Sequence, residues 1–247
     1  MDMDIKDKFL VLWNRYFNDA ELPIAFYYTD EEGQAEPAVP GETPGCIIGA
    51  LANVRKGNPL SFHVDSIGCP GGKKYLGFAE GIMPNFEYFL STGIPGELEG
   101  ERYCKSPDLV KEVFEQMPVF KAPGRFIVFK RWDDLDEYDE PEIIIFFAEP
   151  DVLSGLFTLY RFDETEKDIV YAPFGSGCST IVQFPYLEKV ADHPRAVIGM
   201  FDPSARPYVP KNTVTFSFPM KKLVTMIEYM EESFLITDTW KYVQNRI

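Results

Sequence analysis

Two stretches of the chain resemble each other, and each carries a Gly-Cys pair at the same relative place. Gly45-Cys46 is followed by Gly68-Cys69, after the strand-like residues 60–67. Gly177-Cys178 is followed at nearly the same spacing by Gly199-Met200. Two repeat units that cannot each bury an apolar face alone pack against each other. An internal duplication therefore predicts two halves with a groove between them, where a ligand site is expected.

Apolar segments on either side of the Gly-Cys pairs extend the resemblance. Residues 24–30 resemble residues 143–149, and residues 125–129 resemble residues 214–218. Alternating apolar and aromatic residues are typical of strands. Each copy is therefore expected to contain a strand, a helix that begins near the cysteine, a second strand and a closing strand.

The chain is expected to adopt an α+β fold of two related halves, with mixed β-sheets and flanking helices. The first half, residues 1–140, contains an opening helix and the first copy, with a helical insertion. The second half, residues 141–247, contains the second copy, and the two halves are packed as one globular unit. The acidic segment Asp133–Glu142 is expected to be the linker between them.

Apolar spacing, proline and glycine set the expected elements. Residues 30–45 are predicted to form a loop, and residues 153–160 fit either a helix or a strand. Helices are predicted over 5–17, 46–55, 106–117, 178–189 and 219–235, and strands over 22–29, 60–67, 125–130, 143–148, 195–200 and 213–218.

Charge and composition exclude several kinds of partner. The formal net charge is −15, and no long run of basic residues provides a phosphate-binding surface. Nucleic acid and anionic membrane surfaces are therefore not expected partners. The N-terminus lacks a secretory pattern, and no apolar run is long enough for a membrane helix. A cytoplasmic protein with reduced cysteines is expected.

Cys46, Cys69 and Cys178 are the candidate catalytic residues. Cys46 and Cys178 are expected at helix starts, where helix N–H groups lower a thiol pKa. The alternative is that these cysteines are small, buried core residues. No metal site is predicted, because the cysteines are far apart in sequence and structural metals prefer closely spaced pairs.

Two glycine-rich turns are the candidate ligand-binding elements. Glycine allows a backbone turn to present several N–H groups to one ligand, which suits an acidic or phosphate-bearing molecule. A guanidinium group provides an anchor for the same kind of ligand. The candidate cofactor-binding residues are Gly68, Gly71, Gly72, Gly175, Ser176, Gly177 and Arg206.

These motifs carry a family resemblance. At Cys46, at residues 66–72 with residues 76–78, at residues 100–103 and at residues 174–178, the chain resembles the prokaryotic family called domain of unknown function 169. The resemblance spans nearly the whole chain and implies no established activity. Met200 stands where a cysteine is common in that family, which weakens any model that needs four thiols.

The sequence favours a cytoplasmic protein that binds a small molecule or cofactor at the glycine-rich turns between two homologous halves. It does not identify the cofactor and does not decide whether the protein is an enzyme. One alternative is a cysteine-based redox or metal/iron–sulfur protein. The other is a non-catalytic interaction module whose cysteines belong to the core.

Overall fold

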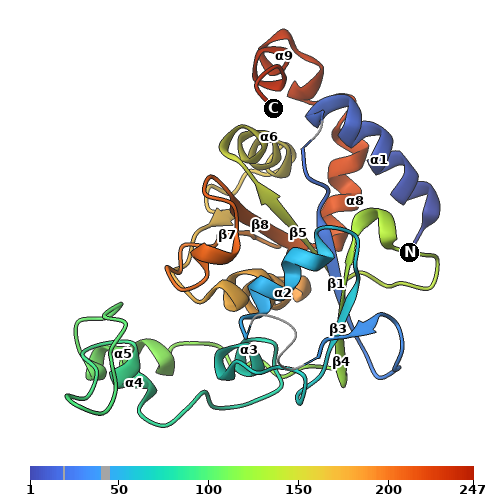
Figure 1. Ribbon diagram of the computed structural model, residues 1–247. Helices are drawn as coiled ribbons and strands as arrows, with labels where there is room; N and C mark the ends of the chain where they lie inside the picture. The colour runs from blue at the N-terminus through green and yellow to red at the C-terminus, as the bar shows by residue number, and fades with distance from the viewer. Residues whose placement is uncertain (19, 40–44) are drawn as a thin grey trace.

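The computed structural model describes residues 1–18, 20–39 and 45–247. The strands within these residues form one eight-stranded mixed sheet (Figure 1). The α+β class is confirmed, but the expectation of more than one sheet is wrong. Antiparallel pairing of Ile24 with Ile145 joins the strands of the two predicted halves. The strands are β1 (Ile24–Thr29), β2 (Glu36–Pro37), β3 (Leu60–Phe62), β4 (Phe126–Arg131), β5 (Ile143–Ala148), β6 (Val170–Tyr171), β7 (Ala196–Gly199) and β8 (Val214–Pro219).

The strands pair in the same pattern from each edge of the sheet to its middle. The order is β2-β3-β4-β1-β5-β8-β7-β6. Strands β2 and β3 are parallel, as are β6 and β7. Strands β3, β4 and β1 then pair antiparallel, as do β7, β8 and β5. This pattern agrees with two related halves, whereas the duplication itself stays a prediction.

Helices cover both faces of the sheet, because successive side chains of a strand point to opposite faces. In β5, Ile144 and Phe146 join the core under α1, α6, α8 and α9. Ile143 and Ile145 join the core under α2, α3 and α7. The helices are α1 (Met3–Phe17), α2 (Ile47–Val54), α3 (Pro70–Tyr75), α4 (Phe86–Phe89), α5 (Pro107–Glu115), α6 (Pro150–Tyr160), α7 (Phe184–Leu187), α8 (Met220–Tyr229) and α9 (Asp238–Gln244).

Several elements differ from their predicted extents. The strand predicted over 60–67 ends at Phe62, because the Ser66 hydroxyl bonds the backbone of His63 and closes a turn. Residues 153–160 belong to helix α6, which begins at Pro150. The helix predicted over 178–189 starts as a π-helical segment, 179–183, and continues into α7. Residues 40–44 of the predicted loop lie outside the described residues.

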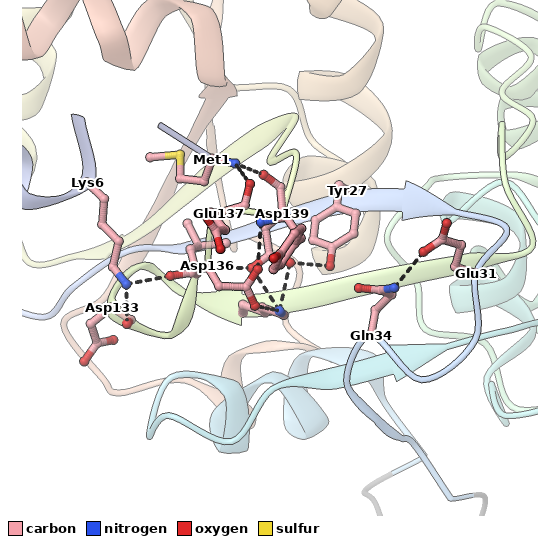
Figure 2. A network of polar contacts seen from close by, with 12 residues as sticks. Met1, Lys6, Tyr27, Glu31, Gln34, Asp133, Asp136, Glu137 and Asp139 are labelled. Carbon is pink, nitrogen blue, oxygen red and sulfur yellow. Dashed lines mark hydrogen bonds and ion pairs between the residues drawn. The ribbon is translucent and has the colours of Figure 1, made fainter. Parts of the chain in front are cut away.

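The predicted acidic linker is fixed to the body of the protein by a polar network, which Figure 2 shows. Asp139 is 1% exposed, and its carboxylate accepts hydrogen bonds from Lys130 Nζ at 2.9 Å and from the Tyr27 hydroxyl at 2.5 Å. The Met1 amino group donates to the Asp139 carbonyl. Lys6 Nζ donates to the carbonyl oxygen of Asp133 at 2.8 Å. Residues 133–142 are therefore a packed structural element, with little resemblance to a free linker.

Residues 80–117, the insertion predicted from the sequence, contain α4 and α5. Figure 1 shows both helices lying away from the sheet, beyond α3 and far from α9. Helix α5 begins as predicted, with the Ser106 hydroxyl accepting a hydrogen bond from the Leu109 N–H. No helix in the described parts of the chain is long and apolar enough to cross a membrane.

Candidate ligand-binding cavity

A cavity of about 370 Å³ lies between the 80–117 insertion and the body of the protein. Helix α3, the loop over 174–176 and residues 202–204 provide the body side. Val113 and Phe174 are 45% and 62% exposed, so the cavity reaches the surface. Its apolar lining comes mainly from the insertion and comprises Ile82, Met83, Phe86, Phe89, Leu90, Val110, Val113, Phe114, Met117, Phe174 and Phe184.

The polar lining gathers around Asp202, whose side chain is held by a turn of its own loop. Asp202 is 6% exposed. Its Oδ1 accepts hydrogen bonds from the Ser204 N–H at 2.9 Å and the Ser204 hydroxyl at 2.8 Å, which is common turn chemistry for Asp-x-Ser. Its Oδ2 accepts from the Gly177 N–H at 3.2 Å. Among the described residues, no Lys, Arg or His forms an ion pair with this carboxylate.

Tyr103 lies beside this carboxylate and brings an aromatic ring to the polar end. Burial, together with the charges of Asp202 and Glu101, raises the pKa of Tyr103 to about 12. The hydroxyl therefore stays protonated near neutral pH. The ring packs edge-on against Phe174, with ring centroids 5.9 Å apart. The carboxylates of Glu101 and Asp202 thus meet the Tyr103 phenol and the Phe174 ring at one end of a largely apolar cavity.

The two predicted glycine-rich turns do reach one cavity. Gly71, Gly175 and Ser176 all line it. The first segment is not a nest, however, because Gly71 and Gly72 belong to the first turn of helix α3. Gly68 is outside the lining of the cavity.

Gly72 and Gly177 do not line the cavity and instead allow neighbouring elements to pack closely behind its wall. A Cβ on Gly72 would lie 3.0 Å from Ile47 Cγ1. A Cβ on Gly177 would lie 2.8 Å from Ala205 Cβ, closer than side chains approach. Their small size is therefore explained by the close approach of neighbouring elements.

Arg206 does not line the cavity. Its guanidinium donates to backbone carbonyls, including those of Met200, Thr213 and Lys211, and so holds the loop after β7. Among the described residues that line the cavity there are two carboxylates, Glu101 and Asp202, and no Lys, Arg or His. The cavity is therefore unsuited to the acidic or phosphate-bearing ligand that the sequence suggested.

The three candidate thiols lie close together beside the cavity. Cys46 and Cys69 are the N-cap residues of α2 and α3, and Cys178 precedes the π-helical segment. Burial raises the pKa of the Cys46 thiol, although the N–H groups of α2 oppose this effect. Burial, with the nearby Cys46 and Cys69, raises the pKa of the Cys178 thiol well above its ordinary value. The predicted lowering by a helix start is therefore outweighed by desolvation.

Only Cys69 of these three lines the cavity, where it is joined by Cys104 of the insertion. All four cysteines lie within the described residues and are free thiols. Within residues 1–18, 20–39 and 45–247, no three His, Cys, Asp or Glu side chains form a group that could hold a metal ion.

We expect Cys178 to be alkylated at least about tenfold more slowly than Cys104 by iodoacetamide near neutral pH, because it is buried and its thiolate is disfavoured. Peptide mass spectrometry at several reaction times gives both rates in one sample. The fully unfolded chain is the control, in which the two rates should converge. Faster modification of Cys178 in the folded protein would contradict this placement.

The sequence did not reveal Asp202, Glu101, Tyr103 or the apolar wall. Asp202 stands in an ordinary turn sequence, Asp-Pro-Ser, which carries no functional signal by itself. Glu101 and Tyr103 fall within the segment 100–103 that contributed to the family resemblance, and this was their only signal.

Comparison with known proteins places the chain in a family without providing an activity. The model of the family DUF169, described as Uncharacterised ArCR, matches residues 16–229, and the chain therefore belongs to that family. No curated protein and no solved structure matches the chain.

Proposed function

We propose that this DUF169 protein binds a small molecule with an apolar body in the cavity between the insertion and α3. The cavity itself is the observation that carries the proposal. Its volume of about 370 Å³ is in the range of small-molecule sites, and its lining is mostly apolar with a few convergent polar groups. No reaction is assigned, since binding is what the geometry supports.

The exposed apolar side chains that line the cavity favour its interpretation as a ligand-binding site over that of a space left by imperfect packing. Phe174 is 62% exposed and Val113 is 45% exposed, although both side chains face the cavity. Removing apolar surface from water stabilises a complex by roughly 25 cal/mol per Å². An apolar ligand would cover these side chains, whereas water leaves them unfavourably hydrated.

The positions of the lining residues also fit the two-half organisation. Gly71 belongs to the segment 1–140, and Gly175 belongs to the segment 141–247. The common strand pairing of the two segments supports an internal duplication, and a site at their junction follows from it. We retain the duplication as part of the proposal.

The thiol-based alternative has less support. The cluster of Cys46, Cys69 and Cys178 is real, but burial disfavours the thiolate at Cys46 and Cys178. The free state of all four cysteines fits a reducing compartment, and we propose the cytoplasm. The net charge of −15 supports a small-molecule ligand over nucleic acid or an anionic membrane.

A pair of variants on helix α5 tests the proposal. Val113 and Leu109 are both partly exposed, at 45% and 41%, but only Val113 lines the cavity. We expect Val113→Trp to weaken binding of the neutral apolar dye Nile red by more than about tenfold, because the indole fills the space. Leu109→Trp should bind the dye like the unmodified chain. Fluorescence titration measures both affinities.

Thermal unfolding of both variants provides the control for folding. Equal loss of dye binding in Val113→Trp and Leu109→Trp, or saturable binding that neither change affects, would place the dye outside the cavity and reject the proposal.

A further inference from the structure

The polar end of the cavity has a charge pattern that specifies the ligand further. We infer that the ligand carries an ammonium group, which Asp202 binds inside the cavity and Glu101 attracts at its rim. This inference rests on the proposed function, because it concerns the same cavity. It excludes the anionic ligands that the sequence favoured.

Among the described residues, the buried Asp202 carboxylate has no Lys, Arg or His as an ion-pair partner. Asp202 is 6% exposed, and the three hydrogen bonds to its carboxylate come from the neutral Ser204 and Gly177. Withdrawing a charge from water is costly unless an opposite charge or several hydrogen bonds compensate. Two carboxylate oxygens accept about four hydrogen bonds in total, so capacity remains for a further donor. An ammonium group in the cavity would supply both the donor and the missing charge.

Tyr103 and Glu101 strengthen the preference for a cation. Glu101, Tyr103 and Asp202 line the same cavity, and the charges of both carboxylates raise the pKa of Tyr103. The Tyr103 and Phe174 rings lie edge to face and line the cavity beside these charges. Aromatic faces attract cations, and the attraction grows where water is excluded. The carboxylates and the aromatic rings therefore both favour a positively charged head group.

The lining contains no group that would counter this preference. Among the described residues that line the cavity, none is a Lys, Arg or His. The remaining surface is mostly apolar and suits an alkyl or aryl body. The inferred ligand class is thus an amine with an apolar body.

Three ligands test the inference on the full chain: phenylbutylamine, phenylbutanol and phenylbutyrate. Each has a phenyl ring on a four-carbon chain, and they differ in the terminal polar group. At neutral pH they carry a positive charge, no charge and a negative charge. We expect the amine to bind at least about tenfold more tightly than the alcohol, since a hydrogen bond to a charged group is worth more than a neutral one. The acid should bind most weakly. Isothermal titration calorimetry measures the three affinities.

Two charge-neutralising variants locate the effect. Asp202→Asn should reduce the affinity for the amine by about tenfold and leave the alcohol within about twofold. Glu101→Gln should reduce the affinity for the amine by a smaller factor, because Glu101 is exposed. Glu99→Gln is the matched control, since Glu99 is exposed on the same loop but does not line the cavity. It should change neither affinity.

The outcomes separate the two proposals. Equal binding of amine and alcohol by the unmodified chain would overturn the ammonium inference and leave the apolar cavity in place. Failure of all three ligands to bind would reject both. If Asp202→Asn does not fold, the comparison of the three ligands on the unmodified chain and the Glu101→Gln variant still decide the question.

Discussion

We expect Asp139→Ala to lower the free energy of unfolding by about 3 to 5 kcal/mol, because it removes the buried carboxylate that pairs with the buried Lys130 ammonium group. The side chains of Lys130 and Asp139 are 7% and 1% exposed, and Lys130 Nζ lies 2.8 Å from Asp139 Oδ1. The same carboxylate accepts hydrogen bonds from the Tyr27 hydroxyl and the Asp136 N–H, so the variant also leaves these donors unpaired (Figure 2).

Urea denaturation near neutral pH measures this effect, and Asp136→Ala is the matched control. The Asp136 side chain contacts the same Lys130 but is 54% exposed, so its loss should cost less than about 1 kcal/mol. Replacing the pair together, as Lys130→Met with Asp139→Leu, should recover part of the loss because no unpaired charge remains. Equal unfolding free energies for Asp139→Ala and Asp136→Ala would contradict this account of the network.

We expect Trp240→Ala to lower the free energy of unfolding by about 3 to 5 kcal/mol, the usual cost of removing a large buried aromatic side chain. Trp240 is 2% exposed and packs edge-on against Phe17 and Phe234. Its indole N–H donates to the Tyr16 carbonyl at 2.8 Å. Helix α9 thus covers the part of the core that contains helix α1. It lies after residue 229, where the match to the family model ends.

Tyr242→Ala is the control for this prediction, since Tyr242 lies in the same helix and is 76% exposed. Its removal should change stability by no more than about 0.5 kcal/mol. Urea denaturation of both variants gives the comparison. If Trp240→Ala is as stable as Tyr242→Ala, helix α9 contributes little to the core, which contradicts its packing over helix α1.

The sequence correctly predicted those helices and strands whose signals lie within the element itself, such as an N-cap or an apolar run. Ser106 and Pro107 mark the start of helix α5, where the structure has its N-cap. The apolar run over 143–148 predicted strand β5, all of whose side chains are buried. Strand β3 was predicted too long, because a side-chain hydrogen bond from Ser66 ends the extended segment and the apolar pattern does not reveal it.

The sheet and the site depend on contacts between distant segments, and these were less predictable. Repeat similarity indicated more than one sheet, since it describes each half alone and says nothing of the β1–β5 pairing between them. Gly71, Gly175, Ser176 and Cys69 do reach one cavity, in line with the idea of converging turns. The opposite wall comes from the insertion, which has no counterpart in the second half and therefore carried no repeat signal.

Charge at the site was the least predictable property. Glycine-rich turns and Arg206 suggested an anion, because the sequence could not show that the Arg206 guanidinium is occupied by backbone carbonyls. The burial of Asp202 depends on the packing of its loop against Gly177, which is distant in sequence. Cysteines at helix starts suggested reactive thiols, whereas the depth of burial decides their pKa.

A crystal structure of the full chain grown with phenylbutylamine is the most direct test of the cavity as a ligand site. We expect the phenyl ring to lie between helix α5 and residues 174–176, with the ammonium nitrogen within hydrogen-bonding distance of the Asp202 carboxylate. The ligand bound elsewhere on the surface, or the cavity closed by its own side chains with the amine absent, would contradict this expectation.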